Sequence, residues 1–158
     1  MKKIFLSLIV STMISLSAFA DGQKEALDFF NNYVNSANSY SATVADMYSP
    51  SAKIIRQVVK PDGTTVNATT DTATYIKQMK LGQAGAKLRQ YKNHYTHIVV
   101  SSIDDNTYKV TALRQPSGED YKLKTYMILK KDANGKWSII EEMMQTKQQI
   151  FLRYADKG

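Results

Sequence analysis

The amino-acid sequence predicts an α+β fold in which N-terminal helices pack on a curved antiparallel sheet, and two patterns support this. In residues 23–37, apolar side chains recur at spacings of three and four and so share one face of a helix. In the second half, strand-forming residues fill four runs that are separated by turn compositions. Short connections between the runs favour sequential antiparallel pairing. The runs span residues 88–103, 107–115, 121–131 and 137–146.

The segment between these two parts predicts a short helix followed by a hairpin. Ser41 can cap the helix, and Pro50 ends it because the residue before a proline avoids helical angles. Isoleucine and valine dominate residues 51–60, which favours a strand. The Pro-Asp-Gly turn at 61–63 then allows residues 64–68 to return as a second strand.

A third helix is expected after the hairpin. Thr70 or Asp71 can cap it, and Gly82 or Gly85 is expected to end it, because each glycine costs roughly 1 kcal/mol relative to alanine. The tail, residues 147–158, contains several apolar side chains. It either continues the last strand or folds back as a short helix.

The first twenty residues have the order of a secretory signal peptide. Two lysines precede an apolar run over residues 4–16, and a small-x-small pattern ends at Ala20, next to the polar Asp21. The run is shorter than the ~20 residues that a membrane-spanning helix needs. We therefore expect residues 1–20 to be removed, which leaves a single exported domain over residues 21–158, in the periplasm or secreted.

Composition narrows the classes of function. The chain has no cysteine, which excludes disulfides and a lipid-modified cysteine. Without Lys2 and Lys3, the 138 residues of the expected mature chain carry 19 basic and 14 acidic side chains, a net charge of +5. The lysines are scattered and no nucleic-acid or cofactor motif is present. We therefore expect no nucleic-acid partner, no cofactor and no membrane span after cleavage.

Three segments carry a resemblance to a known family. They are the first helix with Phe30 and Tyr33, the helix-to-strand segment 44–54, and the segment 134–139, in which a glycine turn leads into a tryptophan strand. Together they resemble the nuclear transport factor 2-like superfamily, which includes SnoaL-like cyclases and ketosteroid isomerase. The resemblance implies a cystatin-like cone: a curved sheet wrapped around helices, with a pocket at the open end. It also implies that a homodimer can form through the outer face of the sheet.

The resemblance places a catalytic carboxylate of the isomerase type on the strand after the second helix. The corresponding residues 55–58 contain Arg56 and neither aspartate nor glutamate. A guanidinium cannot abstract a proton at ordinary pH, which argues against the isomerase mechanism. Arg56 either binds a carboxylate or phosphate through its planar fork of donors, or reaches solvent from an edge strand.

The two histidines, His94 and His97, lie in a strand-like run. Residues of opposite parity point to opposite faces of a strand, so the two cannot share a ligand unless a bulge intervenes. With no cysteine in the chain, we expect no metal site. His97 either lines the cone as a neutral hydrogen-bonding group or lies on the surface or in the core.

Two adjacent carboxylates on the last strand, Glu141 and Glu142, give the acid/base candidate. In a regular strand, one of them faces the covered side of the sheet, and the pattern does not say which. A carboxylate there is costly unless it is paired or lies in the pocket. The alternative is a strand that extends beyond the helices and leaves both side chains in solvent.

Tyrosine and methionine supply apolar side chains that adapt to irregular spaces, with 10 and 7 copies. Tyr33, Tyr75 and Met79 can line a cavity or form part of the core. The sequence thus predicts an exported domain that binds a small apolar or amphipathic ligand, or a protein partner, without catalysis. The alternatives are an isomerase, cyclase or hydrolase with a pocket carboxylate, and a structural subunit of an envelope assembly. The ligand-binding candidates are Tyr33, Arg56, Tyr75, Met79, His97 and Glu142.

Overall fold

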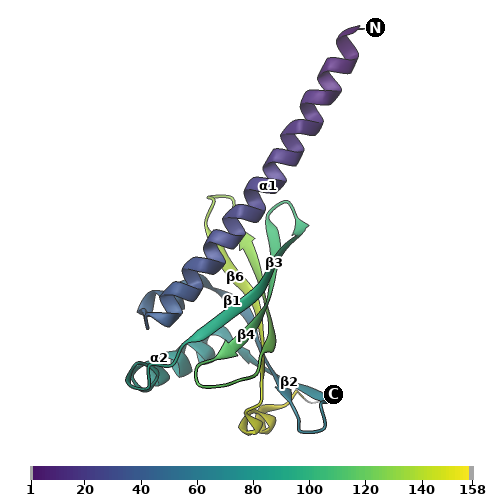
Figure 1. Ribbon diagram of the computed structural model, residues 1–158. Coiled ribbons are helices and arrows are strands. Elements are labelled where there is room, and N and C mark those ends of the chain that lie inside the picture. The colour runs from purple at the N-terminus through teal and green to yellow at the C-terminus, as the bar shows by residue number, and fades with distance from the viewer. Residues whose placement is uncertain (1, 157–158) are drawn as a thin grey trace.

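The computed structural model describes residues 2–156, and Figure 1 shows how their elements are arranged. Two α-helices, two 3-10 helices (η) and six strands are present among these residues. In chain order they are α1 (Lys2–Asn38), η1 (Ala42–Met47), β1 (Tyr48–Val59), β2 (Thr65–Asp71), α2 (Thr72–Leu88), β3 (Asn93–Asp104), β4 (Thr107–Pro116), β5 (Leu123–Lys131), β6 (Trp137–Thr146) and η2 (Gln149–Tyr154).

The strands form one sheet in the order β2-β1-β6-β5-β4-β3. The predicted hairpin of β1 and β2 and the predicted meander of β3 to β6 are both confirmed. The sheet is mixed, however, and not antiparallel throughout, because β1 pairs in parallel with β6. This pair joins strands that are separated by β2, α2 and most of the meander. No local sequence pattern marks such a distant neighbour.

Both long helices pack on the same face of the sheet. α1 contributes Ala26, Phe30 and Tyr33 to the apolar core, and α2 places Tyr75 and Met79 against it. Burial of this apolar surface is the main favourable contribution to folding. Figure 1 shows the C-terminal half of α1 crossing the sheet, while its N-terminal half projects beyond it. The sheet residues of the core are Tyr48, Ala52, Ile54, Tyr108, Val110, Ala112, Met127, Leu129, Ile139 and Met144.

The expected helix starts are confirmed. Ser41 accepts a hydrogen bond from the Thr43 amide at the start of η1, and Asp71 accepts one from the Thr74 amide at the start of α2. The expected end of α2 is wrong: the helix continues through both glycines to Leu88. Glycine lowers helix propensity without blocking any backbone hydrogen bond, so a helix that packs on the sheet can continue through it.

The tail folds back as a short helix and does not continue the last strand. After β6 it forms η2, and the chain then reaches the edge of the sheet. Asp156 accepts hydrogen bonds from the backbone amide and the hydroxyl of Thr69 on β2, at 2.9 and 2.6 Å. These bonds cover part of the β2 edge. Within residues 2–156, no helix has both the length and the hydropathy to cross a membrane.

Replacing two glycines by alanine should change the free energy of unfolding in opposite directions. Gly82 lies inside α2, and a Cβ there meets no atom within 4 Å. Gly82→Ala should therefore raise the free energy of unfolding by about 0.4–1 kcal/mol. Gly63, in the hairpin turn, has a φ of +83°, so Gly63→Ala should lower it by about 1–2 kcal/mol. Urea denaturation measures both, and changes of the same sign would contradict the assignment.

Candidate functional site

A pocket of about 470 Å³ lies between the C-terminal end of α1, helix α2 and the inner face of the sheet. Aromatic and aliphatic side chains form much of its wall, and its charged lining residues are Arg56, Arg89, Arg114 and Glu119. A concave site that combines apolar walls with polar groups can bind a small molecule. The apolar and aromatic lining includes Tyr33, Val44, Tyr75, Met79, Leu123, Met144 and Phe151.

An ion pair closes one side of this pocket. The Arg56 Nη1 atom on β1 lies 2.8 Å from Glu142 Oε1 on β6. The Glu142 side chain is fully enclosed, and that of Arg56 is 15% exposed, so Arg56 lies between the carboxylate and the pocket. The Arg56 guanidinium also stacks over the Tyr75 ring, 4.9 Å from its centroid. Arg56 therefore does not point into solvent from an edge strand.

Two tyrosines occupy the second oxygen of the same carboxylate. The Tyr48 hydroxyl donates to Glu142 Oε2 at 2.5 Å, and the Tyr33 hydroxyl lies 3.4 Å from the same oxygen. Burial, with the nearby negative charge of Glu142, raises the pKa of both tyrosines well above the ordinary value. Both hydroxyls consequently stay protonated and act as donors. Glu142 is thus a buried charge with an arginine and two neutral donors around it.

A β-bulge decides which of the two adjacent glutamates faces inward. Ile139 pairs with Leu129 and Glu141 with Ile128, so Ile140 is an extra residue on β6 with no partner on β5. The extra residue shifts the alternation by one position, which puts Glu142 on the same covered face as Ile139. Glu141 accepts a bond from the Tyr126 hydroxyl and is only half-buried. The expectation that both side chains lie in solvent is therefore wrong.

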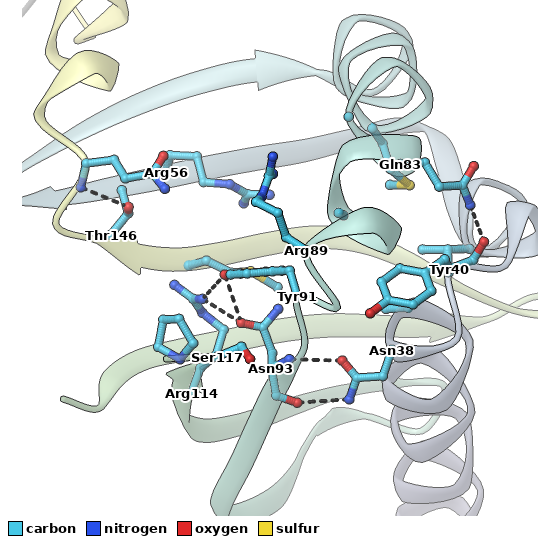
Figure 2. Close-up of a pocket in the computed structure, with 18 of the residues that line it drawn as sticks. Asn38, Tyr40, Arg56, Gln83, Arg89, Tyr91, Asn93, Arg114, Ser117 and Thr146 are labelled. Carbon is cyan, nitrogen blue, oxygen red and sulfur yellow. Dashed lines mark hydrogen bonds between the residues drawn. The ribbon is translucent and has the colours of Figure 1, made fainter. Parts of the chain in front are cut away.

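Arg114 on β4 is a second buried arginine in the pocket wall, and it differs from Arg56 in its partners. It is 6% exposed, and its Nη atoms donate to Asn93 Oδ1 at 2.8 Å and to the Gln145 carbonyl at 2.7 Å. Asn93 is itself fixed by two 2.9 Å bonds between its backbone and the side-chain amide of Asn38 on α1. Figure 2 shows this chain of contacts from α1 to Arg114.

Four of the six predicted ligand-binding residues line the pocket: Tyr33, Arg56, Tyr75 and Met79. Glu142 lies behind Arg56 and does not line it. His97 is exposed on β3 and takes no part in the pocket. Its φ of 54° and the register shift between Thr96 and Val99 place it in a bulge of the edge strand, which breaks the alternation that the sequence suggested.

Two residues of the site, Arg114 and Tyr48, were not predicted from the sequence. Arg114 has the same strand parity as Tyr108, Val110 and Ala112, which form the apolar face of β4. A charged residue on an apolar face is a signal that could have identified it. Tyr48 carried no such signal, because its role depends on the pairing of β1 with β6. Within residues 2–156, no group of three His, Cys, Asp or Glu side chains is placed to hold a metal ion.

No protein-family model matches the chain, and no curated protein matches its sequence. Several solved structures are similar to it. A DUF3225-family protein of unknown function from Pectobacterium atrosepticum has a TM-score of 0.60 and 12% identity, over 80% of this chain and 91% of its own. A candidate scytalone dehydratase from Novosphingobium aromaticivorans has a TM-score of 0.55 and 11% identity, over 86% of each chain.

A domain of unknown function from Nostoc punctiforme, described as having a cystatin-like fold, is similar to the same extent. Its TM-score is 0.55 at 12% identity, over 83% of each chain. The structural similarity establishes the fold. At such low sequence identity, the activity has to be argued from the site. The chain therefore has a cystatin-like cone fold, as the resemblance seen in its sequence implied.

Proposed function

We propose that this protein is an exported domain that binds a small amphipathic molecule in the cone pocket and does not transform it. The observation that carries the proposal is the combination of an open pocket, whose walls are both apolar and polar, with a carboxylate that is closed off behind Arg56. The pocket offers volume and apolar contact to a ligand. The group best suited to acid/base chemistry is out of the ligand's reach.

An enzyme that uses Glu142 has one observation in its favour, the 2.5 Å contact with the Tyr48 hydroxyl. A general base must lie within hydrogen-bond reach of the proton that it abstracts. Glu142 has no exposed surface, and Arg56 and Tyr48 occupy its two oxygens. A substrate would have to displace Arg56 and break a buried ion pair, so binding without catalysis is the better-supported function.

The way α1 packs supports export. Of its residues 19–22, the first three are exposed, and Gly22 is the first that is buried. A Cβ at Gly22 would lie 2.0 Å from the Tyr108 hydroxyl oxygen, so the helix is in close contact with the sheet from this point. Gly22 lies just after the expected cleavage site between Ala20 and Asp21. Removal of residues 1–20 would leave this packing in place. That the domain binds a protein partner or forms a homodimer stays a prediction from the sequence.

Filling the pocket should abolish the binding of a neutral apolar probe. Ala86 and Ala84 lie on the same helix, but only Ala86 lines the pocket. N-phenyl-1-naphthylamine, a neutral dye whose fluorescence rises in apolar sites, should bind the wild-type protein at a single site. Ala86→Trp should weaken this binding at least tenfold because the indole occupies the space, whereas Ala84→Trp should not. Fluorescence titration measures both, and equal affinities for the two variants would refute the pocket as the site.

Removing the buried carboxylate should destabilise the protein far more than removing its neighbour. Glu142→Gln leaves the charge of Arg56 without a counter-charge, which should lower the free energy of unfolding by about 3–5 kcal/mol. Glu141→Gln is the matched control on the other face and should cost about 1 kcal/mol or less. Adding Arg56→Met to Glu142→Gln should recover much of the loss. Urea denaturation provides all three values, and similar losses for the two glutamate variants would contradict a structural role for Glu142.

Export predicts a specific processed mass. When the full-length chain is expressed in a Gram-negative bacterium, intact-mass spectrometry of the periplasmic fraction should find a protein that begins at Asp21. Ala20→Tyr should block processing, because signal peptidase requires a small residue at that position. Asp21→Asn is the matched control and should be processed normally. An uncleaved wild-type chain that stays in the cytoplasm would refute export.

A further inference from the structure

Arg114 is a buried positive charge without a counter-ion among the described residues. Of residues 2–156, none forms a salt bridge with it, whereas Arg56 is paired with Glu142. Its hydrogen-bond acceptors are the Asn93 side-chain oxygen, the Gln145 carbonyl and the Tyr91 hydroxyl, and none of them is a carboxylate. Its buried Nε atom has no partner. A buried charge is costly unless an opposite charge is close. In the described part of the chain, the pocket therefore lacks a negative charge next to Arg114.

The other charges near the pocket add to this imbalance. Arg89 lines the same pocket and is exposed. Lys147 lies over the ring of Tyr121, another lining residue, with its Nζ atom 3.9 Å from the ring centroid. The single acidic lining residue, Glu119, is exposed on the turn after β4. The field inside the pocket is therefore positive, and it draws anions into a cleft with apolar walls.

Polar and charged groups are distributed unevenly in the pocket. Figure 2 shows Arg56, Arg89 and Arg114 at one end, and Asn38, Tyr40 and Gln83 at the other. At the second end, the Gln83 amide donates to the Tyr40 backbone carbonyl. Apolar side chains such as Met79 and Val44 complete the wall. A ligand whose charged group lies among the arginines, and whose remaining part contacts these apolar side chains, fits this distribution.

We propose that the ligand of this pocket is an amphipathic anion whose carboxylate, sulfonate or phosphate group pairs with Arg114 at the arginine end, while its apolar part lies against the aromatic and aliphatic wall. The inference rests on the proposed binding function and specifies its chemical class. A planar guanidinium with free donors is suited to oxyanions. The Asn38–Asn93 contact holds Arg114 in place before the ligand arrives, which reduces the entropic cost of binding.

The test compares two dyes with the same aromatic frame. 8-Anilinonaphthalene-1-sulfonate carries a sulfonate, and N-phenyl-1-naphthylamine does not. Wild-type protein should bind the sulfonate at a single site at least tenfold more tightly than the neutral dye, because a charge-assisted hydrogen bond to a buried arginine contributes about that factor. The two dyes should compete with each other. Equal affinities would overturn the inference while leaving the binding function intact, and failure of both dyes to bind would refute the binding function itself.

Variants assign the preference to one side chain. Arg114→Met should remove the preference for the sulfonate, so that the variant binds the two dyes with similar affinity. Arg153→Met removes the same charge from an exposed position outside the pocket and is the matched control, which should keep the preference. A sulfonate preference that persists in Arg114→Met, or that disappears in Arg153→Met, would overturn the assignment.

A salt series keeps the inference testable if Arg114→Met does not fold. Attraction to exposed lysines is screened at high salt, whereas a buried pair is screened much less. The preference of the wild-type protein for the sulfonate should therefore survive at high sodium chloride concentration. If the affinity for the sulfonate falls to that for the neutral dye as salt rises, surface charge and not Arg114 attracts the anion.

Discussion

The ion pair between Arg56 and Glu142 is the interaction on which the architecture and the pocket both depend. It joins β1 to β6, the two strands that pair in parallel and that connect the N-terminal hairpin to the meander. A buried pair of this kind contributes little net stability compared with apolar packing, but losing one partner is costly because the other charge stays buried. The pair thus favours the one arrangement of β1 and β6 in which both charges are satisfied.

The same pair determines what the pocket can do. Arg56 and Tyr48 occupy the oxygens of Glu142, and the Tyr33 hydroxyl also lies near one of them, so the carboxylate contributes structure and no accessible base. The Tyr75 ring packs against the Arg56 guanidinium, and both side chains line the pocket. With Arg56 neutralised, Arg114 is left as the buried positive charge that the wall of the cone does not balance. We therefore infer that Arg56 serves the structure and that Arg114 is the arginine available to a ligand.

Much of the fold could be predicted from local patterns, and the site only in part. The Ser41 and Asp71 caps, the hairpin and the meander follow from residues close in sequence, because capping and turn formation are local interactions. Tyr33, Tyr75 and Met79 followed from apolar periodicity together with the family resemblance. Glu142 and His97 could not be placed with certainty, because each lies at or next to a bulge that interrupts the strand alternation.

The sequence by itself determined an α+β chain with an apolar helix face, six strand-forming runs, a leader-like N-terminus and no cysteine. These properties depend on composition and on spacings of a few residues. The tertiary structure decided that β1 lies beside β6, that Glu142 and not Glu141 faces the core, and that Arg114 is buried without a counter-ion in the part of the chain that the structure describes. Each of these depends on contacts between residues far apart in the chain, and one extra residue in a strand is enough to change which side chain points inward.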